Sequence, residues 1–189
     1  MFSYLGLKNH RRGSQLLEHK SELGYWREDR NRYSRTAWIT QPSYWAIMIY
    51  RFGRWTRTAP SLIRLPAHSV YYLAYAFVRL STGIDIPRGA SFGPGLLIHH
   101  FGGIIINPQV KVGANCVMRQ GVTTGTKYDS GGVPTLGDNV VLGAYAQVLG
   151  DVRIGDGAII GALSLVICDI PAGETAVGIP ARIVRSSHP

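Results

Sequence analysis

Cysteine is scarce in this sequence. Cys116 and Cys168 are the two cysteines among 189 residues, and neither belongs to a C-x-x-C pattern. A disulfide scaffold or a cysteine-based zinc site needs more cysteines at closer spacing. We therefore expect both side chains to be buried as small apolar groups, which is how free cysteines usually pack.

Long apolar runs are absent as well. The segment from Met1 to Arg12 has no apolar stretch before its basic residues, so it lacks the pattern of a secretory signal peptide. No run approaches the roughly 18 apolar residues that a membrane-spanning helix requires. These absences predict a cytoplasmic protein, and attachment to the inner face of a membrane stays open as a hypothesis.

Acidic residues are few in the first part of the chain. Residues 1–80 hold 13 lysines and arginines against 4 acidic residues, whereas residues 81–189 hold 7 of each. The net charge of +9 therefore belongs to the N-terminal segment. Such a segment is either a solvated basic face or a surface that attracts an anionic partner, such as a membrane or an acidic glycan. No nucleic-acid-binding motif accompanies the charge, so we predict no nucleic acid partner.

The sequence does contain a period of six. Aliphatic side chains recur without a slip at Leu136, Leu142, Val148, Ile154, Ile160 and Val166. Two runs in other phases hold Ile86, Phe92 and Ile98, then Ile106, Val112 and Met118. A small or β-branched residue stands four positions after many of these, as at Ala90, Cys116, Ala158 and Ser164.

A period of six fits neither an α-helix nor a single strand. It is typical of a parallel β-helix, in which six residues form one flat side and a tight corner, so that three sides close a coil of about 18 residues. The aliphatic residues then point inward and stack on their equivalents in the next coil. The sequence therefore predicts an all-β domain over residues 81–189, with regular coils from Ile86 to Pro171.

Residues 1–80 are predicted to form a small, mainly helical N-terminal segment. Gln41-Pro42-Ser43 has the pattern of a helix start, and apolar residues follow it at helical spacing. Pro60 and Pro66 are expected to interrupt the helices, and Thr82-Gly83 to end them. The many aromatic side chains here suit a core, a subunit interface or peripheral contact with a membrane.

Two irregular segments accompany the repeat. Residues 124–135, TGTKYDSGGVPT, break the period and are rich in glycine, serine and aspartate. We expect a loop inserted there, and loops on a rigid scaffold are where binding residues tend to lie. Residues 172–189 include the extended phrase GIPARIV. We expect this segment to cap the open end, because an uncapped coil would expose unpaired strand edges.

Several phrases resemble one protein family. IHHFGGIII, RQGVTTGT, LGAYAQVLGDVRIGDGAIIGALSLV and GIPARIV are similar to segments of serine O-acetyltransferases, a branch of the hexapeptide-repeat acyltransferases. The resemblance extends from Gly83 to Val184. It implies a left-handed parallel β-helix and acyl transfer from acetyl-CoA to a hydroxyl group. The repeat by itself would indicate only the fold, since one fold hosts many functions.

A histidine and an aspartate are the candidate catalytic residues. A hydroxyl group must lose its proton to attack a thioester at neutral pH, and the ordinary pKa of histidine suits that task. A carboxylate behind the histidine would fix its tautomer. Asp85 and His100 are separated by nearly one coil of sequence and are therefore expected to lie side by side. The resemblance implies the same pair, with His100 as the general base and Asp85 as the residue that orients it.

Two departures from the serine enzymes concern the acceptor. The family has an aspartate before the catalytic histidine where this chain has His99, and an Arg-His pair before a proline where it has Gly132 and Val133. Without that arginine a serine carboxylate would lose a bidentate partner, at a cost above about 1 kcal/mol. We therefore expect these three residues to line a site for a sugar or polysaccharide precursor, as in colanic-acid-type O-acetyltransferases of exopolysaccharide and capsule assembly.

The resemblance also implies a place for acetyl-CoA, the expected co-substrate. Its pantetheine arm would follow the coils in a groove between subunits, and basic residues would meet its phosphates. The matching positions are Gly125, Lys127, Gly143, Ala144, Ala162 and Arg182. A shared groove implies a homotrimer with active sites between subunits. No metal is expected.

Alternatives to the sugar O-acetyltransferase stay open. One is a serine O-acetyltransferase of cysteine biosynthesis, and another is a catalytically silent scaffold, which the spacing of Asp85 and His100 argues against. A nucleotide-sugar N-acyltransferase would also use a histidine base. A γ-class carbonic anhydrase would need three histidine ligands, but after His100 only His188 remains.

Overall fold

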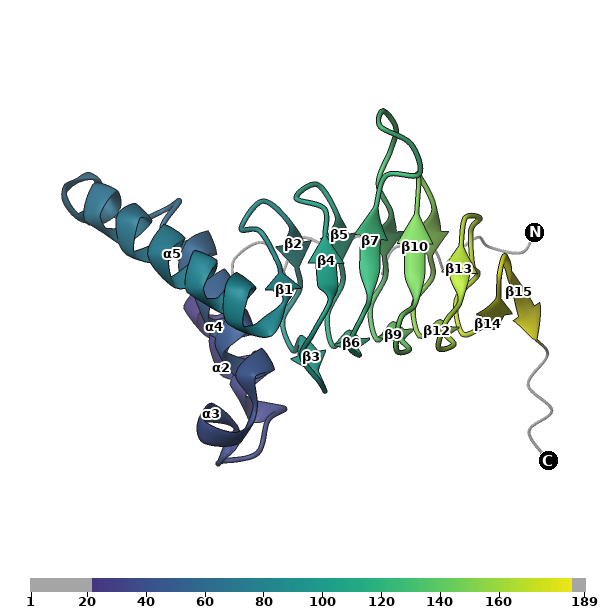
Figure 1. Cartoon of the computed structure of the whole chain (residues 1–189), viewed down its shortest axis with the longest axis horizontal. Helices are drawn as coiled ribbons and strands as arrows, with labels where there is room; N and C mark the ends of the chain where they lie inside the picture. Colours follow the sequence, from purple (N-terminus) through teal and green to yellow (C-terminus); the bar gives the residue numbers. More distant parts are fainter. Residues whose placement is uncertain (1–21, 185–189) are drawn as a thin grey trace, which may run out of the picture.

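The computed structural model describes residues 22–184, so the first 21 residues of the predicted N-terminal segment and the last 5 of the predicted cap lie outside the described residues. A helical part precedes a long stack of short strands (Figure 1). The helices are α2 (Glu22–Asn31), α3 (Ala37–Thr40), α4 (Pro42–Trp55) and α5 (Ser61–Thr82). The predicted order, a helical segment followed by a β-helix, is confirmed.

The strands form a left-handed parallel β-helix with three flat sides. They are β1 (Ile84–Asp85), β2 (Ser91–Phe92), β3 (Leu97–Ile98), β4 (Ile104–Ile106), β5 (Lys111–Val112), β6 (Val117–Met118), β7 (Thr123–Gly125), β8 (Thr135–Leu136), β9 (Val141–Leu142), β10 (Gln147–Leu149), β11 (Arg153–Ile154), β12 (Ile159–Ile160), β13 (Leu165–Val166), β14 (Thr175–Gly178) and β15 (Ala181–Val184). The three sheets have the orders β1-β4-β7-β10-β13, β11-β8-β5-β2 and β15-β14-β12-β9-β6-β3.

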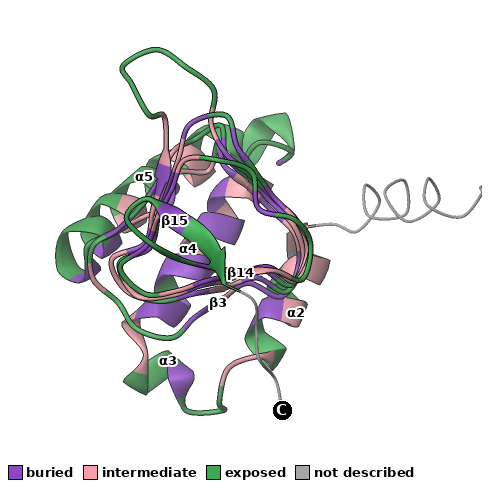
Figure 2. Ribbon diagram, turned by 90° about the vertical axis from the view of Figure 1, so that its right-hand side faces the viewer, coloured by how far each residue is buried: buried purple, intermediate pink, exposed green. Residues whose placement is uncertain are grey.

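The period of six points into the core as predicted. Figure 2 shows the buried residues along the coils. All twelve apolar positions of the three runs are buried, at 5% exposure or less. The small-residue positions are buried too, including Cys116 at 1%. Cys168 is exposed, so the prediction for this cysteine was wrong: it follows β13 outside the inward-facing positions.

The coils differ in length. In a regular coil the strand partner lies three repeats of six further along the chain, as Leu165 does from Gln147. The first coil is longer, since Asp85 pairs with Ile105 and the corner between β3 and β4 exceeds the corner between β6 and β7 by two residues. The coil that links Thr123 to Gln147 is longer still, because an inserted loop separates β7 from β8.

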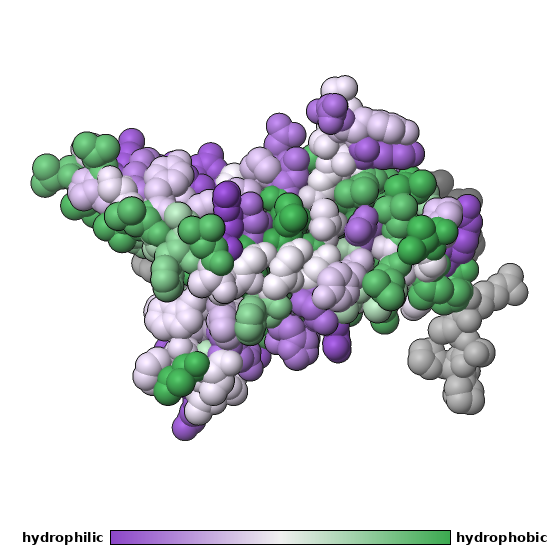
Figure 3. Space-filling model, viewed as in Figure 1, coloured by the Kyte–Doolittle hydropathy of each residue, from purple (hydrophilic) through white to green (hydrophobic). Residues whose placement is uncertain are grey.

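The helices follow the predicted boundaries with one exception. α4 begins at Pro42, and α5 ends where Gly83 takes a left-handed φ of 67°. Pro66 does not interrupt α5, contrary to expectation, and lies inside it. It stands near the start of a helix of 22 residues, so it removes one hydrogen bond while the apolar inner face continues to pack on α4. The outer surface of α5 is markedly hydrophobic (Figure 3).

A buried ion pair joins the helices to the first coil. Arg51 on α4 donates from Nε to Asp29 Oδ2 on α2 at 2.7 Å, and both side chains are at most 2% exposed. The same guanidinium donates to the carbonyl groups of Phe92 and Gly93, at 2.8 and 2.6 Å. Asp29 Oδ1 in turn accepts the backbone N–H of Leu96 at 2.8 Å. The pair therefore satisfies strand-edge groups that have no earlier coil to pair with.

Two tyrosines complete this edge. Tyr50 accepts the N–H of Phe92 and donates to the carbonyl of Ala90, at 3.1 and 2.9 Å. Tyr33 accepts the N–H of Ile98 and donates to its carbonyl, at 2.9 and 3.1 Å. Burial raises the pKa of both phenols to about 12, so both remain protonated donors at neutral pH. The helical segment is thus the cap of the N-terminal edge, and part of its aromatic content belongs to the core.

The other end of the stack closes differently. β14 pairs with β12 in parallel, and β15 turns back to pair with β14 in antiparallel fashion. A cis peptide bond joins Ile179 and Pro180 in the turn between them. The phrase GIPARIV therefore supplies the final strand at the edge of this sheet.

We predict that Asp29→Ala lowers the free energy of unfolding by about 3 kcal/mol, because it removes the hydrogen-bonded partner of the buried Arg51 guanidinium and leaves it only Glu22, 3.6 Å from Nη1. Urea denaturation at fixed protein concentration would measure the change. Arg57→Ala is the control, since Arg57 is exposed, and should change stability by no more than about 0.5 kcal/mol. A loss below about 1 kcal/mol for Asp29→Ala would contradict a central role for the pair.

Candidate active site

The lengthened corner between β3 and β4 carries both candidate histidines. It runs from His99 to Gly103, and Gly102 and Gly103 have left-handed φ values of 109° and 66°. The backbone is held by two bonds to the next coil, from His99 N to Met118 O at 3.1 Å and from Gly121 N to Gly102 O at 2.8 Å. Both imidazoles are exposed, with ring centroids 6.5 Å apart.

His99 lies in a positive field. Partial burial lowers its pKa, and the charges of Arg119, His100 and Arg32 lower it further. Arg119 follows β6, one coil beyond the corner of His99. His99 is therefore neutral at pH 7, and an anionic group that approached this corner would meet the charge of Arg119.

Asp85 has partners that the sequence did not reveal. Its carboxylate accepts a hydrogen bond from the hydroxyl of Tyr75 and lies 3.6 Å from Nη1 of Arg79. Both partners project from α5, one helical turn apart. Burial and this bond to Asp85 raise the pKa of Tyr75. The carboxylate is thus held from the helical side.

The predicted contact between Asp85 and His100 is not made in the single chain. The strand partner of Asp85 is Ile105, beyond His100 in the chain, because the lengthened corner adds to the first coil. Within residues 22–184 His100 makes no hydrogen bond, and the carboxylate of Asp85 is engaged by Tyr75 and Arg79. The pairing of Asp85 with His100 stays a prediction.

Three of the six positions expected to bind acetyl-CoA, Gly143, Ala144 and Ala162, fall in the same column as the histidines. β3, β6, β9 and β12 are neighbours in one sheet, and Gly143-Ala144 and Gly161-Ala162 follow β9 and β12 as His99 follows β3. Three strand steps separate the ends of this column, about 14 Å. A Cβ at Gly143 would lie 2.5 Å from the backbone N of Ala162, so the coil itself requires glycine there. Ala162 is exposed and leaves room for a ligand beside it.

The inserted loop lies across one flat side from this column. Thr124 and Gly125, predicted to belong to the insert, are part of β7, and the loop spans residues 126–134. Gly125 accepts the N–H of Gly150 at 2.9 Å, and Lys127 projects over the ring of Tyr128, 5.4 Å from its centroid. Figure 1 shows the loop standing out from the coils.

The insert residues predicted to bind the acceptor have different surroundings. A Cβ at Gly132 would lie 2.5 Å from Cβ of Asp151, so a larger side chain cannot occupy this backbone position unchanged. Val133 is half-buried and packs against the core. Of the two, Gly132 is exposed at the loop surface.

Arg182 lies at the far end of the stack. It sits on β15 opposite Val177, is exposed, and donates from Nη1 to its neighbour's carbonyl at 3.0 Å. Its sheet also contains the strands that precede the column of corners. Within the described part of the chain, no cluster of three His, Cys, Asp or Glu residues could hold a metal ion.

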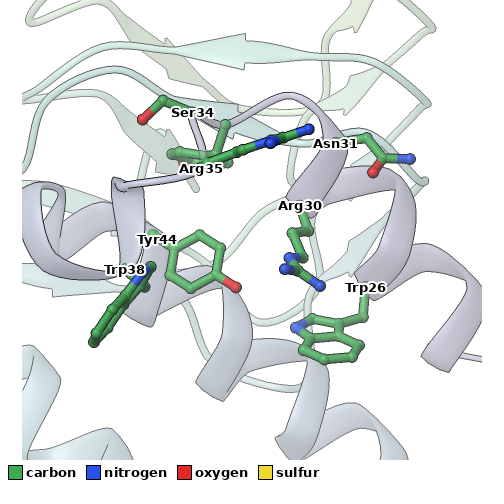
Figure 4. Close-up of a pocket in the computed structure, with 8 residues that line it drawn as sticks. Trp26, Arg30, Asn31, Ser34, Arg35, Trp38 and Tyr44 are labelled. Atoms are coloured by element: carbon green, nitrogen blue, oxygen red, sulfur yellow. The ribbon is translucent and has the colours of Figure 1, made fainter.

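A separate pocket of about 540 Å³ lies in the helical segment. Aromatic and basic side chains surround it (Figure 4): Trp26, Arg30, Tyr33, Arg35, Trp38 and Tyr44. None of its lining residues is a predicted site residue. One lining residue, Tyr33, connects the pocket to the first coil, because its hydroxyl donates to the carbonyl of Ile98, the residue before His99.

Sequence reasoning missed three residues near the candidate site: Tyr75, Arg79 and Arg119. Tyr75 and Arg79 are spaced by one helical turn, which places them on one face of α5, but nothing local joins them to Asp85. Arg119 stands in the same place on its coil as His99 does on the preceding one. Aligning the coils at β3 and β6 would have identified it.

Comparison with known proteins supports the fold and changes the expected acceptor. The family model for the bacterial transferase hexapeptide (six repeats) matches residues 134–168. A serine acetyltransferase of Synechococcus elongatus is 36% identical over 153 residues, covering 79% of this chain and 59% of that protein. One from Synechocystis sp. is 44% identical over 150 residues, covering 77% and 57%. The chain thus spans about three fifths of the length of the curated relatives it matches.

Solved structures agree with these relatives. A serine acetyltransferase in complex with CoA has a TM-score of 0.73 at 25% identity, covering 91% of this chain and 73% of that one. The serine acetyltransferase of Neisseria gonorrhoeae in complex with serine has a TM-score of 0.73 at 28% identity, covering 90% and 72%.

The prediction of a sugar or polysaccharide acceptor is therefore wrong, because the relatives and structural neighbours are named serine acetyltransferases rather than exopolysaccharide enzymes. The prediction rested on the absence of an Arg-His pair at Gly132 and Val133. That absence describes only the insert and says nothing about basic residues on other coils. Residues 134–168 carry the hexapeptide repeat of bacterial transferases, and 77–79% of the chain is similar to serine acetyltransferases.

Proposed function

We propose that this protein is an acetyl-CoA-dependent serine O-acetyltransferase. The similarity to serine acetyltransferases, which extends over 77–79% of the chain, carries the proposal. It is supported by the exposed His100 in the lengthened corner of the β-helix, at the head of a column of small residues that would accommodate an extended co-substrate. The N-acyltransferase and scaffold alternatives have no observation in their favour.

His100 is the general base in this proposal. The imidazole takes the proton of the serine hydroxyl as its oxygen bonds to the acetyl carbonyl carbon, and the proton passes to the departing CoA sulfur. Asp85, held by Tyr75 and Arg79, is the orienting carboxylate that would meet the imidazolium once substrate closes the site. Apo hydrogen bonds at catalytic sites are often long and tighten only in the complex.

Arg119 is the residue that holds the serine carboxylate. The insert position expected to carry the family's arginine is Gly132, packed against Asp151. Arg119 is exposed and close enough to lower the pKa of His99. A guanidinium there would place the acceptor carboxylate beside the histidine corner, and His99 would contact the same acceptor.

The active form is a homotrimer whose sites lie between subunits. Tyr145 and Leu163 occupy the corner column with left-handed φ values of 59° and 57°. Such a conformation costs about 1 kcal/mol or more for residues of this kind. Their side chains are 54% and 65% exposed in the single chain. The column of corners that precedes β9 and β12 has asparagine and glycine in this conformation, at Asn139 and Gly157. Strained, exposed apolar side chains beside the site support a subunit interface there.

The function is tested by thiol release from acetyl-CoA with L-serine and with a panel of nucleotide sugars. We expect turnover with L-serine and none above background with the sugars. His100→Ala should lower kcat by at least about 100-fold while the oligomer stays intact, because it removes the base. No turnover of serine would refute the proposed function, and full activity of His100→Ala would refute the assigned base.

We expect Arg119→Gln to raise KM for L-serine by about tenfold or more with little change in kcat, because it removes a charge-assisted contact to the bound carboxylate. Steady-state kinetics at saturating acetyl-CoA would measure the two parameters. Arg153→Gln, exposed on another flat side, is the matched control and should leave KM unchanged. An unchanged KM in Arg119→Gln would assign the carboxylate to another residue.

Leu163→Asp is expected to dissociate the trimer, because it introduces a charge into the proposed interface. Aspartate also tolerates left-handed φ better than leucine, so the backbone should be unaffected. Sedimentation equilibrium should then give the 20.7 kDa single chain rather than three times that mass. Asn139→Asp is the control, since Asn139 is exposed with a φ of 58° at the other corner. A trimer that survives Leu163→Asp would place the interface elsewhere.

A further inference from the structure

The outward half of α5 is apolar, the reverse of an ordinary surface helix. Its inner side is buried through Tyr71, Val78 and Thr82. The outer side carries Leu62, Leu65, Tyr72, Leu73, Phe77 and Leu80, all more than half exposed and reaching 90% at Leu62. Helical spacing places these six on one half-turn that contains no charged residue. A patch of this size on a folded protein marks an interaction surface.

The charge around this face is predominantly positive, and the nearest carboxylate in sequence, Asp85, is paired with Arg79. Residues 30–84 contain eight arginines and neither aspartate nor glutamate. Arg79 stands on the flank of α5, between its buried and its apolar sides. Arg57 is exposed just before the helix, and Arg64 is exposed in its first turn, on the side of the buried residues. The surface thus offers apolar side chains bordered by guanidinium groups.

The apolar surface continues onto the neighbouring helices. A groove of about 390 Å³ joins Phe77 of α5 to Ile39 of α3 and Trp45 of α4. Ile39 is 68% exposed and Trp45 47%. Trp45 donates its indole N–H to the backbone carbonyl of Trp38, so the Trp45 indole is held against α3, where the Trp38 side chain is also exposed. Tryptophan and tyrosine at the rim of an apolar face are typical of the boundary between lipid and water.

We propose that the outer face of α5, with Trp45 and Ile39 at its edge, binds the surface of an anionic lipid bilayer. A helix of 22 residues is about 33 Å long and would lie in the plane of the interface. The apolar side chains enter the boundary of the acyl chains, and the flanking arginines meet the anionic headgroups. Within the described residues no helix is long and apolar enough to cross a bilayer.

A lipid surface fits this face better than a second copy of the chain. A two-fold contact would pair the face with itself. Each copy brings eight arginines from residues 30–84, and the adjacent carboxylate of Asp85 is already engaged by Tyr75 and Arg79, so the rims would meet with like charges. Anionic headgroups supply the missing charge of opposite sign.

Co-sedimentation of the full chain with vesicles tests the proposal. We expect binding to vesicles of phosphatidylcholine with phosphatidylglycerol, weakened by high salt, and weaker binding to phosphatidylcholine alone. Leu73→Glu should lower the partition coefficient by about tenfold or more, because it removes a leucine side chain that would enter the lipid and adds a negative charge. Gln109→Glu, an exposed residue of the β-helix with the same change in charge, is the control and should bind as the unaltered protein does.

Three outcomes would overturn the proposal. Equal binding of Leu73→Glu and the unaltered chain would remove α5 from the contact, and equal binding to neutral and anionic vesicles would remove the charge requirement. Absence of vesicle binding, together with a lower oligomer mass of Leu73→Glu by light scattering, would identify the face as a protein–protein interface. Thiol release with serine, measured without vesicles, reports the proposed function separately.

Discussion

The unpaired edge of the first coil is the constraint on which this structure depends. A β-helix satisfies its backbone groups by pairing each coil with the next, so the first coil presents carbonyl and N–H groups that have no partner. Here side chains supply what a preceding coil would have supplied: Arg51 and Tyr50 bond the backbone of Phe92, Asp29 bonds that of Leu96, and Tyr33 bonds that of Ile98. Burying a charged pair is favourable only when every remaining donor and acceptor is satisfied, and the strand edge provides those partners.

The corner between β3 and β4 connects the scaffold to the chemistry. In a regular coil the paired residues are 18 positions apart, and each corner lies beside the corner of the next coil. Two additional residues lengthen the corner at His99–Gly103, and the bonds from His99 and Gly102 keep its backbone in register. The same lengthening sets Asp85 opposite Ile105, and both imidazoles of the corner are exposed.

Much of the fold could be predicted because the period of six is a direct record of which side chains point inward. The inward positions, the start of α4 at Pro42 and the end of α5 before Gly83 all follow from local rules. The cap of the first coil could not be predicted, since Asp29, Arg51 and Leu96 are distant in sequence and nothing local marks them as partners. The predicted acceptor was wrong for a related reason: the missing arginine at Gly132 is visible in the sequence, whereas the place of Arg119, which we propose holds the acceptor carboxylate, required the register of two coils.

α5 contacts the proposed catalytic carboxylate and also carries the proposed membrane-binding face. Its flank holds Asp85 through Tyr75 and Arg79, while its outer half is the apolar face. The ring of Tyr71 is stacked on that of Tyr75 and lies so close to Gly53 of α4 that a Cβ there would not fit. Any movement of α5 would therefore also move Tyr75. The carboxylate proposed to orient the catalytic base is therefore positioned by the same rigid element that would contact a surface. Whatever binds the outer face of α5 acts on a helix whose register fixes that carboxylate.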